Sequence, residues 1–430
     1  MDITTLLKRG FKLTAIASFF FWHFAVALPE GAQVSAGSAT VTQSGTTTTI
    51  NQSSQNTVIN WTGFNTAVNE TVRFNQPSVS SIALNKINSG LPTNFNGSLF
   101  ANGQVWIVNP NGVVFGANSQ VNVAGLLVTT HNITDSNFMS GQYKFDMVPG
   151  FENSKIINNG SITVADTGMV ALVAPGVENN GIITANLGKV YLSSGSSFVL
   201  DLYGDQLINF GTSPAVQNGY VSNSGTITAN GGKVYMTANS AAQVVQDVVS
   251  MSGTIEATSV SVNKKGEIIL NGGNAGTTRV SGKLKASGGG HIETSGHKLI
   301  IEPTAVIDAG QGGSWLVDPY NIIVAGAGST SNNSGQPNFT PTGNDSTIDV
   351  ALIDTQLSGG TNVTLATGGV GSPGAQAGDI TFNSVMTSSG ATATLFLNAL
   401  HDVTINAAMT TTGQNIDITA GHQINLKAPA

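Results

Sequence analysis

A short sequence unit recurs along this chain, and its length limits the possible folds more than any other feature. The segment NNGSITVADTGMVAL starts at Asn158 and NNGIITANLGKVYL starts at Asn179, an offset of 21 residues. Further on, DITFNSVMTSSG (379–390) matches DVTINAAMTTTG (402–413) at an offset of 23 residues. A βαβ unit needs about 30 residues or more, whereas so short a period, made only of short β-type runs, fits one coil of a β-solenoid.

Residues within each unit alternate as they do in strands. In NSGTITANGGKVYM (223–236), Ile227 and Ala229 alternate with threonines, so we expect the apolar side chains to face the interior of the coil. The Lys-Val-Tyr of residues 189–191 recurs at residues 233–235, an offset of 44 that we interpret as two coils. These residues would lie on one outer face, either as a solvated ladder or as an adhesive stripe.

The composition favours a chain built of strands. Only 9% of the 430 residues are charged, 52 are glycine, and no persuasive helical periodicity is found after Leu28. We therefore expect an all-β fold with roughly 18 coils in a rod of about 85 Å. The formal net charge of −7 gives no basic patch for nucleic acid.

The amino terminus has the features of an export signal. A basic start is followed by an apolar run from Leu13 to Ala27, which ends in the Ala-Val-Ala pattern of a signal-peptidase site. The run is shorter than the ~20 residues of a spanning helix, so residues 1–27 are expected to be a cleaved signal peptide with no stable membrane insertion afterwards. An exported chain without cysteine must be held together by burial and hydrogen bonds alone.

The sequence NPNG at residues 109–112 is the best-defined turn in the chain. Pro110 presets φ at the second turn position, Asn111 tolerates the third and Gly112 closes the turn. The residues on both sides are β-branched and aromatic, as in strands. This stretch therefore predicts a strand, a tight corner and a second strand.

Five segments around this turn form a set that follows the leader in a fixed order. They are INQSSQNTVINWTGFN (50–65), VRFNQP (72–77), IALNKI (82–87), NGQVWIVNPNGVVFG (102–116) and VNVAGLLVTTHNI (121–133). Together they resemble the amino-terminal secretion domain of filamentous-haemagglutinin-type exoproteins, which are the substrates of bacterial two-partner secretion. The resemblance covers roughly the first third of the chain.

This resemblance implies a right-handed parallel β-helix that a dedicated outer-membrane β-barrel transporter recognises and threads outward. The positions that match the family's NPNG motif are Asn109, Pro110, Asn111 and Gly112, so these are the candidate partner-recognition residues. Two interpretations stay open: the turn only forms a corner of one coil, or the transporter reads it directly. Where some members carry a second Asn-Pro signature upstream, this chain has Phe74–Pro77, and no site is transferred there.

Changes in composition divide the mature chain. We expect the secretion β-helix over residues 28–300, connecting coils over 301–324, and a loop or linker rich in Gly, Ser, Asn, Pro and Thr over 325–347. Further solenoid repeats follow over 348–430. Because no polar cap follows the last strand, we interpret the chain as a shortened member of a family of longer proteins.

No enzymatic or metal site is expected. Nucleophile-elbow, P-loop and HExxH motifs do not occur, and the five histidines after the leader lie far apart: His131, His291, His297, His401 and His422. His291 and His297 could approach on one coil, but a metal site needs a third ligand. Asp201 and Asp205 are interpreted as part of a surface loop or side hairpin over residues 195–219, rather than as a calcium site or a catalytic pair. We expect no cofactor.

These features predict a secreted, non-enzymatic exoprotein of the adhesin or haemagglutinin type. It would cross the periplasm, leave through its outer-membrane partner and bind host or cell surfaces. One alternative is a fragment that carries a toxin of the contact-dependent inhibition or haemolysin type, which would require a C-terminal effector. A less favoured alternative is a β-helix carbohydrate-active enzyme.

Overall fold

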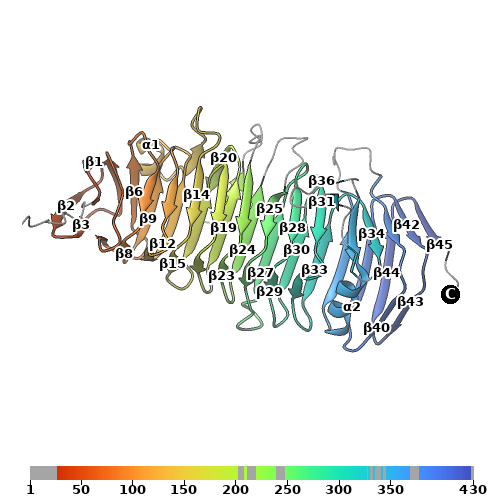
Figure 1. The fold of residues 1–430 in the computed structure, drawn as a ribbon. Helices are drawn as coiled ribbons and strands as arrows, with labels where there is room; N and C mark the ends of the chain where they lie inside the picture. The colour runs from red at the N-terminus through yellow and green to blue at the C-terminus, as the bar shows by residue number, and fades with distance from the viewer. Residues whose placement is uncertain are drawn as a thin grey trace, which may run out of the picture.

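The chain folds into one elongated stack of β-coils (Figure 1). This computed structural model describes residues 27–430 apart from residues 202–207, 211–218, 239–246, 327, 330–332, 335–339, 342–344, 369–376 and 428–430. The expected signal peptide lies outside the described residues except for Ala27.

Three long sheets form the walls of the stack. The 14-stranded sheet contains β1 Gln33–Ala36, β4 Asn56–Trp61, β6 Ile82–Ile87, β9 Gln104–Val108, β12 Gly125–Thr129, β16 Met169–Val173, β19 Lys189–Ser194, β24 Lys233–Ala238, β27 Glu267–Asn271, β30 His291–Ser295, β33 Ser314–Asp318, β38 Asn362–Ala366, β41 Thr394–Ala399 and β44 Asn415–Ala420. The 11-stranded sheet contains β2 Ala39–Ser44, β3 Thr47–Gln52, β5 Thr71–Asn75, β8 Ser98–Ala101, β11 Gln120–Val123, β15 Ser161–Val164, β18 Ile182–Thr184, β23 Thr226–Thr228, β26 Thr254–Glu256, β29 Lys283–Lys285 and β32 Val306–Asp308. The 8-stranded sheet contains β7 Thr93–Phe95, β10 Val113–Phe115, β14 Lys155–Asn158, β17 Gly176–Asn179, β22 Tyr220–Asn223, β25 Asp247–Met251, β28 Thr277–Val280 and β31 Lys298–Ile301.

Smaller elements complete the chain. A 5-stranded sheet contains β34 Ile322–Ala325, β37 Ser346–Asp349, β39 Ile380–Phe382, β42 Asp402–Ile405 and β45 Gln423–Leu426, and β40 Met386–Ser389 pairs with β43 Met409–Thr412. β35 Asn333–Ser334 and β36 Thr340–Pro341 form a short antiparallel pair. Outside the coils lie β13 Lys144–Asp146, β20 Ser197–Leu200, β21 Ile208–Phe210 and helix α1 Asp135–Met139, while helix α2 covers Val350–Ser358.

Strands of successive coils pair in parallel, and their inward side chains fill one continuous interior. Ile227 and Ala229 are fully buried, as the alternation predicts. Near the amino terminus the rings of Phe64, Phe95 and Phe115 stack across three coils with centroid distances of 6.3 and 5.9 Å. The prediction of a parallel β-solenoid is confirmed, and its coils wind in the right-handed sense that parallel crossovers almost always adopt.

The coils are fewer than the repeat length predicts, because some contain long excursions. Lys189–Ser194 pairs directly with Lys233–Ala238, so the offset of 44 residues is one coil and not two. The two lysines and the two tyrosines pair in register on one outer face, as expected, with the rings of Tyr191 and Tyr235 stacked at 4.9 Å. Tyr191 is buried, so its ring is not part of a solvated ladder. With β1 antiparallel, the 14-stranded sheet has 13 parallel strands. At about 4.8 Å per strand these span about 58 Å rather than about 85 Å.

The amino-terminal end of the stack is closed by antiparallel pairing. β1 pairs with β4, and β2 forms a hairpin with β3. Such pairing satisfies backbone groups that a bare first coil would expose, and it covers the first layer of the core.

A second apolar cluster lies on the outer face of the 14-stranded sheet. α1 and the three-stranded sheet β13-β20-β21 cover this face between β4 and β19. Trp106 points outward from β9, and its ring lies 5.6 Å from Phe138 and 4.9 Å from Tyr143. β20 and β21 confirm the side hairpin expected in residues 195–219, whereas Asp205 lies outside the described residues.

Helix α2 interrupts the expected run of strands in residues 348–430. Asp349 caps it, since its Oδ1 accepts a hydrogen bond of 2.8 Å from the Ala351 N–H. Val350, Ile353 and Leu357 are buried in the core. The helix lies between β32 and β40, where a further strand of the 11-stranded wall would otherwise stand. Both helices of the described residues are short, α1 with 5 residues and α2 with 9, so the expectation of a chain built of strands without a long helix holds there.

The polar repeat residues Asn-Asn-Gly form a corner between the 8-stranded and 11-stranded sheets. Asn158, Asn179 and Asn223 are fully buried inside it. Asn158 Nδ2 donates to Asn179 Oδ1 at 2.8 Å, and Asn179 Nδ2 donates to Asn223 Oδ1 at 2.6 Å. The recurring asparagines thus satisfy one another from coil to coil.

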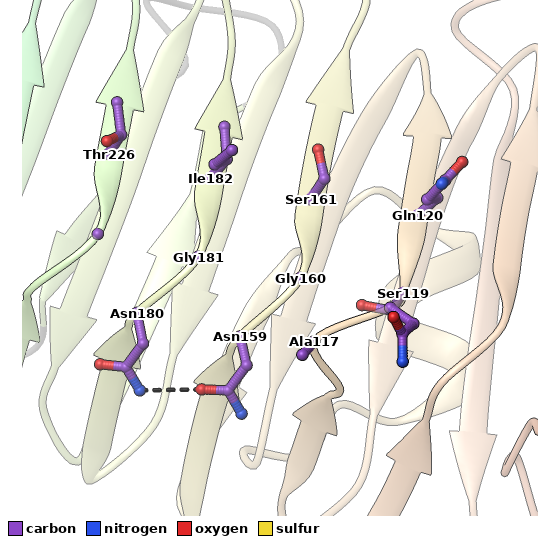
Figure 2. A pocket seen from close by; sticks show the side chains of 12 residues that line it. Ala117, Ser119, Gln120, Asn159, Gly160, Ser161, Asn180, Gly181, Ile182 and Thr226 are labelled. Atoms are coloured by element: carbon purple, nitrogen blue, oxygen red, sulfur yellow. Dashed lines mark hydrogen bonds between the residues drawn. The ribbon is translucent and has the colours of Figure 1, made fainter. Parts of the chain in front are cut away.

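The outer side of the same corner is a shallow polar hollow (Figure 2). There, Asn180 Nδ2 donates to Asn159 Oδ1 at 3.0 Å. Each glycine of this corner lies against the backbone of the preceding coil. A Cβ at Gly225 would lie 2.1 Å from the Gly181 carbonyl oxygen, and one at Gly181 would lie 2.1 Å from that of Gly160.

Replacing one of these glycines should loosen the stack. Gly225→Ala is expected to lower the free energy of unfolding by about 2 kcal/mol or more, because the added methyl group overlaps a backbone oxygen that cannot move alone. Urea unfolding of the mature chain, followed by circular dichroism, measures this. Gly90→Ala is the control, since nothing lies within 4 Å of its added Cβ. Equal stability of the two variants would contradict the close-packing argument.

His131 makes the outer cluster sensitive to acid. Its side chain is fully buried, its Nε2 lies 2.9 Å from the Gly195 carbonyl oxygen, and burial lowers its pKa from 6.5 to about 4. As the pH falls from 6.5 to about 4, the unfolded chain binds a proton at His131 that the folded chain does not bind. This histidine should therefore reduce the free energy of unfolding by about 3 kcal/mol over that range.

The test compares the pH dependence of stability in the wild type and in His131→Gln. Between about pH 6.5 and 4 the wild type should lose more stability than the variant. Comparing the two proteins separates the effect of His131 from that of Asp318. Burial raises the pKa of Asp318 to about 6, so protonation of Asp318 stabilises the folded chain as the pH falls. Parallel pH profiles would show that His131 does not resist protonation.

Candidate functional site

The NPNG motif forms the corner between β9 and β10, as predicted. The Gly112 N–H donates to the Asn109 carbonyl oxygen at 3.0 Å, which closes the turn. Gly112 has a φ of 108°, and a Cβ there would lie 2.6 Å from the Lys155 carbonyl oxygen of the next coil. The position therefore requires glycine for both its conformation and its close approach.

Asn109 is the internal anchor of this corner. It is fully buried, and its Nδ2 donates to the Leu91 carbonyl oxygen at 3.2 Å and to Thr93 Oγ1 at 3.0 Å. Its Oδ1 accepts the Asn111 N–H at 3.0 Å. The side chain thus joins the turn to the chain segment of the preceding coil, which is a structural role.

Pro110 and Asn111 form the outer part of the corner and are partly exposed. Asn111 Nδ2 donates to the Ser89 carbonyl oxygen at 2.8 Å. The motif is therefore divided, with Asn109 and Gly112 buried while Pro110 and Asn111 reach the surface.

A hollow next to Asn111 adds residues that the sequence does not single out. Its wall combines apolar and polar groups, including Pro92, Val114, Phe151 and Lys155. They come from successive coils and from the loop before β14, so only the coil register places them beside the turn. Sequence reasoning could have found Val114, which lies in the same segment, but not Phe151.

Lys155 links this hollow to a charged ladder on the 8-stranded sheet. Its Nζ lies 3.3 Å from Glu178 Oε1 and 5.2 Å from the centre of the Tyr220 ring. A hydrogen bond with Tyr220 raises the pKa of Lys155, which keeps its positive charge at the edge of the hollow. The surface beside the corner therefore offers an apolar floor and one fixed cation.

The histidines considered in the sequence analysis do not lie at the NPNG corner. His291 Nδ1 lies 2.8 Å from Ser314 Oγ, and the His297 ring packs against Tyr320 at 4.4 Å. By contrast, the rings of His401 and His422 stack at 4.7 Å, so the interpretation that all five histidines lie far apart is wrong for this pair. They are 21 residues apart in the sequence but belong to neighbouring coils.

Residues 25–294 match the family model of the TPS secretion domain. The chain is 35% identical over 252 residues to a heme/hemopexin-binding protein of Haemophilus influenzae, covering 56% of this chain and 27% of that protein. It is 28% identical over 224 residues to a second Haemophilus influenzae protein of that name, covering 47% of this chain and 24% of the relative. The chain thus spans about a quarter of the length of these relatives.

Among solved structures, the HMW1 secretion domain from Haemophilus influenzae aligns with a TM-score of 0.63 at 25% identity, covering 93% of this chain and 99% of that one. Within the described part of the chain, no helix is both long and apolar enough to cross a membrane. Because the family match covers well over half of its length, the chain belongs to the two-partner secretion exoproteins, which carry a TPS secretion domain and are secreted across the outer membrane with a partner transporter.

Proposed function

We propose that the coils of residues 28–300 carry the surface by which the outer-membrane transporter recognises this chain, and that Pro110 and Asn111 are part of that surface. The observation that supports this most directly is the division of the NPNG corner into a buried half and an exposed half. Although Asn111 also hydrogen-bonds within the chain, the turn presents Pro110 and Asn111 at the surface beside a hollow, where a partner can contact them.

The hollow is suited to a polypeptide segment of the transporter. An apolar floor formed by residues such as Pro92 and Val114 can bury a side chain, while Lys155 can pair with a carboxylate or a backbone carbonyl oxygen. Since Asn109 fixes the turn from within, the exposed half is held rigid, which lowers the entropy cost of binding.

Folding itself can help export that uses no ATP. Each coil that emerges pairs with the preceding one, so new ladder hydrogen bonds and buried apolar area oppose backward movement through the pore.

Substitution of Asn111 separates recognition from folding. Asn111→Ala removes two side-chain hydrogen bonds at a partly exposed position, to the Ser89 carbonyl oxygen and to Asn109 Oδ1, so the purified mature chain should lose only about 1 to 2 kcal/mol of stability. Secretion in cells that express the transporter should fall by about tenfold or more. Secreted and periplasmic protein are measured by immunoblot.

Two variants complete this experiment. Asn109→Ala should lose about 2 kcal/mol or more, because the Leu91 carbonyl oxygen and Thr93 Oγ1 lose their buried partner, and secretion should fail together with folding. Asn159→Ala, at an exposed corner elsewhere, should be secreted normally. Normal secretion of Asn111→Ala would leave the corner with a structural role alone.

We propose that, outside the cell, the chain acts as a non-enzymatic binding protein of the adhesin type. Several acidic side chains along the outer walls pair with basic side chains on a neighbouring coil, as in Lys233 with Glu267 and Arg279 with Glu302. Side chains used in this way stabilise the rod and give it a regular polar surface. A rod of stacked coils of this kind suits contact with another surface.

Binding of heme or hemopexin is the second candidate, favoured by the names of the two Haemophilus influenzae relatives. The relatives' similarity covers about a quarter of their length, so their ligand-binding residues can lie elsewhere. The adhesin proposal predicts saturable binding of the labelled mature chain to intact cells, competed by unlabelled chain. It predicts no change in the hemin absorbance spectrum and no capture on immobilised hemopexin. Micromolar or tighter binding to either would replace it with the second candidate.

A further inference from the structure

Two histidines and two aspartates lie together on the outer side of the carboxyl-terminal coils, where β39, β42 and β45 begin. The register pairs Ile380 with Val403 and Asp402 with Gln423, so the residues just before these strands lie one above another. This stacking aligns Asp379 with Asp402 and His401 with His422. In Figure 1, β42 and β45 lie at the blue end of the rod.

The ligand atoms of this cluster already lie close to one another. His422 Nδ1 is 2.8 Å from Asp402 Oδ1, and His401 Nδ1 is 3.6 Å from Asp402 Oδ2. Asp379 Oδ1 lies 2.9 Å from His401 Nδ1 and also accepts the Asp402 N–H at 3.1 Å. The donor atoms of His401, Asp402 and His422 lie within 4.8 Å of one another.

These distances match the spacing that a small cation requires. Around Zn²⁺, nitrogen and oxygen ligands at about 2.0–2.1 Å in a tetrahedron lie about 3.3 Å apart. The observed separations of 2.8 and 3.6 Å fall on either side of this value. The two imidazole planes are now nearly parallel, at 7°, so both rings would have to turn toward the ion. The His401 and His422 side chains are 42% and 57% exposed, which leaves them room to turn.

The choice of basic partner distinguishes this ladder from others on the rod. Elsewhere a carboxylate pairs with a permanent cation on a neighbouring coil, as Glu178 does with Lys155 and Glu302 does with Arg279. Here imidazoles occupy those places. A neutral imidazole can offer a lone pair to a metal ion, which lysine and arginine do not at neutral pH.

We propose that His401, Asp402 and His422 bind one divalent transition-metal ion, with Asp379 as a fourth donor. Mixed imidazole and carboxylate donors suit Zn²⁺, Ni²⁺ and Cu²⁺, whereas Ca²⁺ and Mg²⁺ prefer oxygen alone. Binding at Nδ1 requires each ring to carry its single proton on Nε2, so the present hydrogen bonds to the carboxylates are exchanged for metal bonds. The ion would connect three successive coils and stabilise this end of the rod.

Calorimetric titration of the purified mature chain with zinc chloride tests this site. One ion should bind per chain, and His401→Ala and His422→Ala should each weaken binding by about tenfold or more. Zn²⁺ should also raise the melting temperature of the wild type but not that of the variants. His422→Gln keeps a hydrogen-bonding group at the exposed position, so it serves where an alanine variant folds poorly.

Two controls match these changes. His291→Ala removes a histidine from an outward position of another coil, and Asp417→Asn removes the same charge as Asp402→Asn from an exposed position on β44, which lies in a different sheet. Both controls should bind Zn²⁺ as the wild type does, whereas Asp402→Asn should not. Absence of Zn²⁺ binding in the wild type, or binding that survives His401→Ala and His422→Ala, would show that the cluster is only a hydrogen-bonded ladder.

Discussion

Parallel pairing between successive coils is the interaction on which the whole molecule depends. Each strand hydrogen-bonds to the same wall one coil earlier and one coil later, so a side chain's neighbours are fixed by register and not by nearness in sequence. Inside, this register stacks rings and branched side chains; at the corner it stacks Asn158, Asn179 and Asn223 so that their amides satisfy one another. A buried polar group that would be costly alone becomes stabilising when the next coil supplies its partner.

The same register builds the surface sites. The hollow beside Asn111 takes its walls from different coils, and the carboxyl-terminal cluster places His401 over His422. Neither site can be found from a local motif alone, because residues that are neighbours in space are separated in the sequence by one coil of chain. Excursions such as the one between β19 and β24 lengthen a coil without disturbing this alignment, because the pairing resumes in register after the loop.

This dependence explains which features the sequence predicts. Repeat spacing, strand alternation and the NPNG turn are local or periodic, so the β-helix, its interior residues and the corner follow from them. Coil counting fails where a hairpin extends a coil, because an offset of 44 residues fits two short coils as well as one long coil. Helix α2 did carry a signal, namely a capping Asp349 followed by Val350, Ile353 and Leu357 at helical spacing, but its single apolar stripe is brief within a strand-rich region. The repeat offset of 23 residues places Asp379 beside Asp402, but it does not place His401 beside His422. That second alignment follows only from the strand register of the last coils.

Stacking order departs from chain order just beyond the secretion domain. β37 follows β34 in the chain but lies before it in the stack, where the Leu299 N–H of β31 donates to Ser346 Oγ at 2.9 Å. A chain that leaves the pore amino terminus first delivers β34 before β37. This part of the wall is therefore complete only after β37 has also left the pore. Up to that point each coil can pair with one already formed, and the coils of residues 25–294, which match the family model, all belong to this sequentially stacked part.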